Sequence, residues 1–333
     1  MARNRLEPQI AAAGVSSEAA QEMRASADAR VARAQADYDL TRGGIYDLEK
    51  KLEADIPDTE RELLEDRLNF ARAERARLLQ AHSQTHKWTN NDWATPGVQA
   101  QIAVIESVQG DDPAERALLD GQIVTCHEVR AGSNTITQWV LDNGVIGYHK
   151  IFSGLDDDLA EDFGQDEAVQ PIHEVAAWHL AKGMGEPWRG LVPPCVLREI
   201  DGEQGSFAAK APGANYQDFR ATDNWQAAAF FDALIGQQDR HGGNWLVDSR
   251  MLTLIDHGFT FACPGDYCNK ADIQSARKHD PLSEEERAVL ERLVASPDLL
   301  GVRHMLAPDR ADALLARAQQ MLDTGEIPKA GPY

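Results

Sequence analysis

The first ninety residues carry a helical pattern of apolar positions. Four apolar residues recur at seven-residue spacing: Val31, Tyr38, Ile45 and Leu52. This spacing predicts a long helix from residue 16 to about 54 with a face typical of a coiled coil. Pro57 ends that helix, and Thr59 followed by Glu62 forms a capping box that begins a second helix to about residue 80. The pattern therefore predicts an antiparallel helical hairpin over residues 1–85, followed by a connector over residues 86–120.

From residue 121 the period of the apolar positions changes to two, which is typical of strands. Alternation over 121–130, 135–141 and 145–152 predicts a three-stranded antiparallel meander. A small-residue loop at Ala131–Asn134 separates the first two strands, and Asp142–Gly144 is a strong hairpin turn before the third. This part of the chain is expected to be an antiparallel sheet.

The remaining pattern alternates helices with short strands. A helix is expected over 171–185, strands over 191–200 and 205–211, and a buried helix over 224–238. Short strands follow near 245–248 and 251–255, and residues 281–325 return to helix. We therefore predict an α+β fold for this part of the chain.

The charge balance excludes several classes of partner. The 333 residues include 54 Asp and Glu against 33 Lys and Arg, which gives a net charge of −21. Residues 1–90 carry only about −2 of this, so the acidity belongs to the second part of the chain. Binding to nucleic acid or to an anionic membrane surface depends on Lys and Arg, so neither partner is expected.

The sequence shows neither a signal-peptide pattern nor a cysteine spacing typical of a metal site. The N-terminus has no apolar stretch typical of a signal peptide, and no window of 18 apolar residues occurs, so a cytoplasmic protein is expected. Cys263 and Cys268 lie close together, but no second Cys or His pair at zinc spacing accompanies them. We expect free thiols around a turn.

Five residues follow one another in the order that phosphoryl transfer from ATP requires. Lys150, on the third strand, can neutralise phosphates, and Glu174, on the next helix, can keep that lysine aimed. Asp239 can accept or orient the proton of an attacking hydroxyl. Asn244 and Asp256 offer the hard oxygen ligands that a divalent cation prefers.

Three sequence blocks carry a resemblance to a known family. They are HEVAAWHLAKGMG with LVPPCVL after it, IGQQDRHGGNWLVD, and LIDHGFTF. Residues 121–262, which contain them, resemble the catalytic core of the phosphatidylinositol 3-/4-kinase-like branch of the protein-kinase-like superfamily, in particular its small bacterial or phage-type members. DRHGGN and the DHG turn, separated by eleven residues, are the most specific part of the match.

The resemblance implies a two-lobed protein-kinase-like fold, with a small lobe of antiparallel sheet and one helix over 121–210 and a mainly helical large lobe over 211–333. ATP and Mg²⁺ would lie in the cleft between the lobes. It assigns Asp239 as the catalytic aspartate, with His241 beside it as a polar or proton-shuttling partner. Lys150 would contact the ATP phosphates and pair with Glu174. The loop at Ala131–Asn134 would cover the phosphates through Gly132 and Ser133. Asn244 and Asp256 would hold Mg²⁺.

Two functions remain open at this point. The first is an active ATP- and Mg²⁺-dependent phosphotransferase that acts on a protein or small-molecule hydroxyl. The second is a kinase-like structural protein that docks through residues 16–80 into an oligomer or a larger assembly such as a phage particle. The segment after Asp256 has no run of basic residues, so a phosphoinositide fits the sequence least among kinase-like substrates.

Overall fold

The computed structural model describes residues 95–129, 136–152 and 169–331, together with Lys51 and Arg61. The chain divides into two compact units, Met1–Asp92 and Trp93–Tyr333, and only the second is considered below. The predicted helical hairpin and the loop at residues 131–134 lie outside the described residues. In the described part, none of the helices has both the length and the apolar character needed to cross a membrane.

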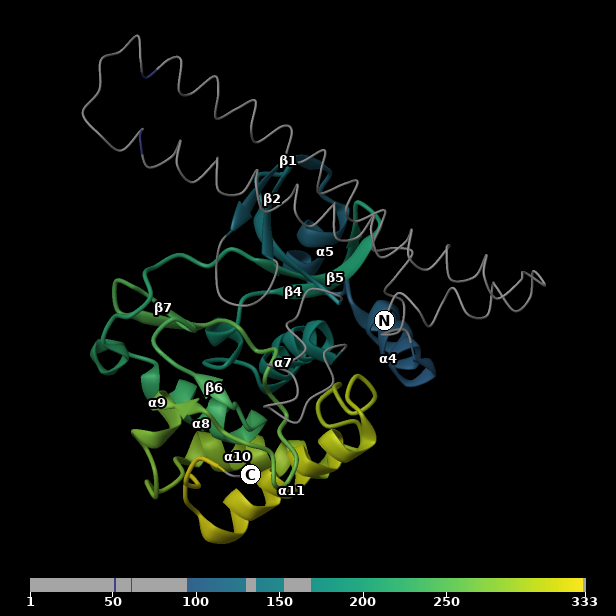
Figure 1. Ribbon diagram of the computed structural model, residues 1–333. Helices are drawn as coiled ribbons and strands as arrows, with labels where there is room; N and C mark the ends of the chain where they lie inside the picture. Colours follow the sequence, from purple (N-terminus) through teal and green to yellow (C-terminus); the bar gives the residue numbers. More distant parts are fainter. Residues whose placement is uncertain (1–50, 52–60, 62–94, 130–135, 153–168, 332–333) are drawn as a thin grey trace, which may run out of the picture. The chain divides into compact units, whose positions relative to one another are not determined.

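A five-stranded antiparallel sheet forms one end of this unit (Figure 1). Its strands are β1 (Ile123–Val129), β2 (Ile136–Leu141), β3 (Ile146–Ile151), β4 (Cys195–Ile200) and β5 (Glu203–Ala209). The spatial order is β1-β2-β3-β5-β4, so the predicted meander is confirmed and β5 extends it next to β3. Gly205 of β5 permits this pairing at Lys150, because a Cβ atom there would lie 2.1 Å from the Lys150 carbonyl oxygen.

Three helices accompany the sheet: α4 (Pro96–Val108), α5 (Pro113–Asp120) and α7 (Gln170–Met184). The first two begin in the same way, with a proline in the first turn after a capping residue. Thr95 Oγ1 accepts from the backbone N–H of Val98, and Asp112 Oδ1 accepts from that of Ala114. The connector predicted over 86–120 thus contains two capped helices, and both contact β4.

The rest of the unit is mainly helical, as predicted. It contains α8 (Trp225–Ile235), the short α9 (Asp272–Ser275), α10 (Glu284–Ala295) and α11 (Pro308–Thr324), with one-turn 3-10 helices η2 (Arg189–Leu191) and η3 (Phe219–Ala221). Two small strand pairs lie among them. Strands β7 (Trp245–Asp248) and β8 (Met251–Leu254) form an antiparallel hairpin, while β6 (Asp239–Arg240) and β9 (Lys270–Ala271) pair in parallel.

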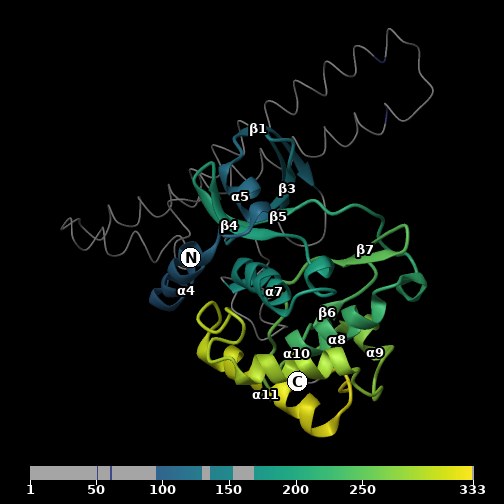
Figure 2. The same ribbon diagram turned by 180° about the vertical axis from the view of Figure 1, so that it is seen from behind.

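One large hydrophobic core joins α4 and α7 to the C-terminal helices. A smaller cluster lies under the sheet around Phe207, Leu141 and Leu118. The view from behind shows α7 between the sheet and the helices α8, α10 and α11 (Figure 2). The predicted α+β class, with an antiparallel-sheet small lobe and a mainly helical large lobe, is confirmed.

Candidate active site

Lys150 is the centre of the candidate site. It lies on β3, paired with Ile136 of β2 and Ser206 of β5. Its ammonium Nζ donates to Glu174 Oε1 at 2.5 Å and to Asp256 Oδ1 at 2.6 Å. Burial alone would lower the pKa of Lys150, but the carboxylates of Asp256 and Glu174 outweigh burial and raise the pKa above its ordinary value. Lys150 is therefore a fixed cation.

Glu174 reaches this lysine from α7, where only 6% of its surface is exposed. Its second oxygen, Oε2, lies 3.7 Å from Nδ1 of His257, the middle residue of the DHG turn. Burial would raise the pKa of Glu174, but Lys150 and then His257 hold it well below the usual range. His257 is itself buried, and burial lowers its pKa. The carboxylate thus links β3 to the DHG turn.

Asp256 and Asn244 are the two oxygen donors that could hold a divalent cation. Asp256 sits at a left-handed backbone position with φ of 62° and uses Oδ1 for Lys150. Asn244 donates from Nδ2 to the Asp239 carbonyl at 2.9 Å, so its Oδ1 is the atom that can coordinate a cation. Mg²⁺ is commonly bound by one or two protein oxygens plus substrate phosphates, and Asp256 together with Asn244 matches this pattern. Among the described residues, no group of three or more His, Cys, Asp or Glu could hold a metal without such phosphates.

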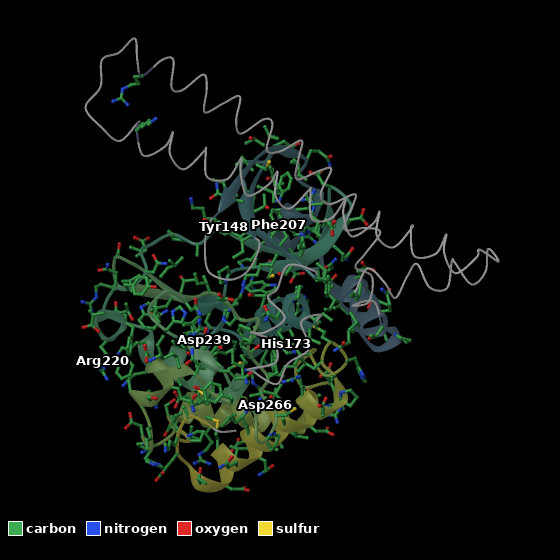
Figure 3. The ribbon with its side chains drawn as sticks, viewed as in Figure 1. Tyr148, His173, Phe207, Arg220, Asp239 and Asp266 are labelled. Atoms are coloured by element: carbon green, nitrogen blue, oxygen red, sulfur yellow. The ribbon has the colours of Figure 1, made fainter. Side chains whose placement is uncertain are left out.

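Asp239 lies at the start of the DRHGGN loop, on β6. Figure 3 shows it among the elements of the large lobe, apart from Tyr148 and Phe207 in the sheet. Its Oδ2 is 3.7 Å from His241 Nε2, while His241 Nδ1 accepts from the backbone N–H of Gly243 at 3.0 Å. A neutral His241 therefore carries its proton on Nε2, the nitrogen that faces Asp239.

Burial raises the pKa of Asp239, and this effect exceeds the lowering by a hydrogen bond from Asn269 and by His241. The neighbouring Asp256 raises it further. A carboxylate with a raised pKa is a better proton acceptor than an ordinary aspartate once it is ionised. These properties suit the role of a base or an orienting group for a hydroxyl.

Two buried side chains hold the DRHGGN loop against the DHG turn. Arg240 is fully buried; its Nε donates to Asp232 Oδ2 at 2.9 Å, and its Nη1 donates to the carbonyl of Ile255 at 2.6 Å. Gln237 Oε1 accepts from the backbone N–H of Asp239 at 3.0 Å, and Gln237 Nε2 donates to the carbonyl of Asp256 at 3.2 Å. The two loops are therefore positioned by the core of the large lobe.

Asn269 contacts the candidate base from the segment that follows the DHG turn. Its Nδ2 donates to Asp239 Oδ1 at 2.9 Å, and its backbone N–H donates to the Gln238 carbonyl at 2.8 Å. Asn269 is not among the residues that the sequence indicates, because only the parallel pairing of β6 with β9 brings it to Asp239. The only local pattern just before Asn269 is the Pro-Gly turn between Cys263 and Cys268, neither of which forms a disulfide bond.

The glycine pair of the DRHGGN loop accommodates an exposed tyrosine. A Cβ atom on Gly242 would lie 2.7 Å from Cδ1 of Tyr216, and one on Gly243 would lie 3.1 Å from its hydroxyl. The backbone N–H of Tyr216 donates to the Gly242 carbonyl at 2.7 Å. Tyr216 is 76% exposed and has a left-handed φ of 57°. Such a backbone position is costly for a residue with a side chain, and it is held here by the loop.

A separate cavity of about 340 Å³ lies beside the segment that joins the two lobes. The residues that line it come from α5, α7, the loop before β4, the end of β5 and β8, and include Ala114, Trp178, Arg189, Lys210 and Thr253. None of the candidate site residues lines this cavity.

The structure brings six of the eight residues singled out from the sequence into two adjoining groups. Lys150, Glu174 and Asp256 form one hydrogen-bonded cluster, while Asp239, His241 and Asn244 share the DRHGGN loop. Gln237 and Arg240 join the groups. Gly132 and Ser133 lie outside the described residues, so their role at the phosphates stays a prediction.

Comparison with known proteins gives no family assignment. No protein-family model and no curated protein sequence matches the chain. Two crystal structures of the Golgi casein kinase, one with Mn and ADP bound, are similar at 14% identity; each covers 63% of this chain and 74% of its own, with TM-scores of 0.41 and 0.42. A similarity of this extent establishes neither an activity nor a substrate, so a function has to be inferred from the site itself.

Proposed function

We propose that this protein is an ATP-dependent phosphotransferase of the kinase-like type that acts on a protein or small-molecule hydroxyl. One observation carries the proposal: Lys150 Nζ lies within 2.6 Å of carboxylates from two other elements, Glu174 on α7 and Asp256 in the DHG turn. In kinases a strand lysine paired with a helix glutamate contacts the nucleotide phosphates, and the aspartate of an Asp-x-Gly turn holds the divalent cation.

In this proposal the acceptor hydroxyl attacks the γ-phosphorus of ATP. The bond from the acceptor oxygen to phosphorus forms, the bond from phosphorus to the β,γ-bridging oxygen breaks, and ADP leaves. Asp239 takes the hydroxyl proton on its carboxylate. His241 Nε2 faces Oδ2 of this carboxylate. Lys150 neutralises charge on the phosphates. Asp256 and Asn244 would hold Mg²⁺, which when bound neutralises phosphate charge.

The narrower assignment to the phosphatidylinositol 3-/4-kinase-like branch is supported by the DRHGGN and DHG motifs alone. The acidity of the chain beyond residue 90 and the lack of a run of basic residues after Asp256 favour an acceptor other than a phosphoinositide or a nucleic acid. These choices of branch and acceptor are part of the proposal.

The test is transfer of label from ATP by the full-length chain in the presence of Mg²⁺. Parallel reactions with γ-labelled and α-labelled ATP separate phosphoryl transfer from nucleotidyl transfer. We expect the γ label alone to be transferred or released, and Asp239→Ala and Asp256→Ala to abolish the signal. Asp248→Ala, at an exposed aspartate on β7, is the matched control and should behave as wild type. Equal signal from all four proteins, or transfer of the α label, would overturn the proposal.

A role in assembly is compatible with this chemistry and is supported by the heptad spacing of residues 31–52. Mass measurement in solution, with and without residues 1–85, tests it. Loss of an oligomer on truncation would support docking through the predicted hairpin. A monomer in both cases, with no partner recovered, would count against it.

A further inference from the structure

Glu115, on α5, is a completely buried carboxylate outside the site described above. Its Oε1 accepts from Trp178 Nε1 at 2.7 Å and from Lys182 Nζ at 2.5 Å. Its Oε2 accepts from the backbone N–H of Gly110 at 2.8 Å. A buried charge is tolerated only when it is paired and hydrogen-bonded, and both oxygens of Glu115 meet this condition.

The side-chain donors to Glu115 come from the helix that carries Glu174. Trp178 and Lys182 lie four and eight residues after Glu174 on α7, which places all three residues on neighbouring faces of one rigid helix. A rotation or shift of α7 that moved Glu174 away from Lys150 would also break the hydrogen bonds to Glu115. The two contacts are therefore mechanically linked.

The segment that contains α4 and α5 is itself anchored to three other parts of the unit. The Gln109 side chain binds β4 like an added strand, accepting from the Leu197 N–H at 2.9 Å and donating to its carbonyl at 3.0 Å. Asp112 Oδ2 pairs with Arg189 Nη2 at 2.6 Å, just beyond the end of α7. Gln101 Nε2 donates to the carbonyl of Met305, in the large lobe, at 2.9 Å. Glu115 is thus held on a fixed support.

Electrostatics keeps Glu115 in its charged form. Burial would raise the pKa of Glu115, but the hydrogen bonds from Lys182, Trp178 and Gly110 outweigh burial and lower the pKa below its ordinary value. His179 Nε2 is 3.8 Å from Oε1, and burial lowers the pKa of His179 to about 4, so this imidazole is neutral at physiological pH. Lys182 is therefore the cation that Glu115 binds at neutral pH.

We propose that Glu115 is a positioning residue for phosphoryl transfer: it holds α7 in the register that keeps Glu174 on Lys150. Residues 96–120 are then a brace of the active site and not a spacer before it. The inference rests on the proposed function for its effect on catalysis, whereas its effect on α7 is independent of any activity.

The experiment compares the full-length wild type with Glu115→Gln, which keeps one acceptor oxygen in place of two and loses the ion pair with Lys182. Trp178→Phe, which keeps most of the ring and loses the donor, is the second variant. Glu106→Gln is the matched control, because Glu106 is an exposed glutamate on α4 that accepts a long hydrogen bond, 3.3 Å, from the side chain of Gln204. Each protein is examined by steady-state kinetics with varied ATP and by hydrogen exchange of the peptide covering residues 170–184.

We expect Glu115→Gln and Trp178→Phe to raise the KM for ATP about threefold to tenfold, the usual size of coupling through a packed element. Exchange in α7 should be faster in both variants, and exchange in α10 and α11 should match that of the control. An unchanged KM together with unchanged exchange in α7 would overturn the inference. A wild type with no ATP-dependent transfer would instead overturn the proposed function, and faster exchange in α7 would still support the brace.

Discussion

Asp256 accepts a hydrogen bond from Lys150 at 2.6 Å, although 106 residues separate them in the sequence. The contact joins the small lobe to the DHG turn of the large lobe, and Glu174 completes it from α7. In a nucleotide complex, the phosphates would also contact the Lys150 ammonium, and the Asp256 carboxylate would also bind a divalent cation. The described geometry is therefore that of a site in which three charged groups compensate one another.

Replacing Lys150 tests this compensation. Lys150→Met should lower ATP-dependent transfer about 100-fold or more, the size of effect seen when one preorganised electrostatic contact is removed. Lys150→Arg should not restore it, because a planar guanidinium cannot take the place of a compact ammonium between Glu174 and Asp256. Initial rates over a range of ATP concentrations measure the effect. Lys210→Met, at an exposed lysine after β5, is the control, and a similar loss there would contradict the prediction.

The buried ion pair behind the DRHGGN loop should contribute strongly to the free energy of unfolding. Asp232 and Arg240 are 1% and 0% exposed, so Asp232→Ala leaves an uncompensated guanidinium in the core. We expect a loss of about 3–5 kcal/mol in the free energy of unfolding. Urea denaturation of the purified variant measures it. Asp223→Ala, which breaks the exposed pair with Arg250, should change the unfolding free energy little, and an equal effect of the two substitutions would refute the argument.

The course of the chain could be predicted from the sequence wherever a local pattern decides it. Period-two alternation located β1, β2 and β3, and the order and spacing of five polar residues indicated the candidate site: Lys150, Glu174, Asp239, Asn244 and Asp256. These signals depend on residues within one element or on motifs of a few residues.

What could not be predicted depends on pairing across long stretches of chain. Nothing near Asn269 shows that β9 will pair with β6 and bring its amide to Asp239. Glu115 likewise lies in the segment that the sequence predicts only as a connector, and only the docking of α5 against α7 makes it a buried partner of Trp178. The acidic composition conceals such residues, because most Asp and Glu residues in the described part of the chain are exposed.

A buried histidine in the small lobe predicts a pH dependence of stability. His149 is 3% exposed, its Nε2 lies 3.1 Å from the carbonyl of Arg198, and burial lowers its pKa to about 4. His149 takes up a proton near pH 6.5 in the unfolded chain but only near pH 4 in the folded chain. The stability that this difference provides is complete above pH 6.5 and is lost as the pH falls towards 4.

Urea denaturation at pH 7.5 and pH 5.0 measures this loss. His149 should account for about 2 kcal/mol of it, from 1.4 kcal/mol per pH unit below 6.5. His149→Gln keeps a donor for the Arg198 carbonyl and does not titrate. Between the two pH values, the free energy of unfolding of this variant should fall by about 2 kcal/mol less than that of wild type. The carboxylates of Glu174 and Glu115 titrate below this window, because both pKa values are lowered. Identical losses in wild type and variant would show that His149 is not responsible.

The glycine pair of the DRHGGN loop leads to a prediction in which a second substitution should reverse the effect of the first. A methyl group on Gly242 would lie 2.7 Å from the ring of Tyr216, closer than nonbonded carbon atoms approach. Gly242→Ala should therefore push the ring away or displace the DRHGGN loop, and overpacking of this kind costs about 1–3 kcal/mol. Because the loop carries Asp239 and Asn244, transfer activity should fall together with the free energy of unfolding.

Tyr216→Ala removes the ring and should restore much of what Gly242→Ala loses, even though Tyr216→Ala alone gains nothing in stability. Residues in direct contact show such non-additive effects, whereas independent sites add. Urea denaturation and label transfer for the two single variants and the double variant complete the cycle. If the double variant is as impaired as the two single losses added together, then the steric contact with Tyr216 is not the reason that glycine occupies position 242.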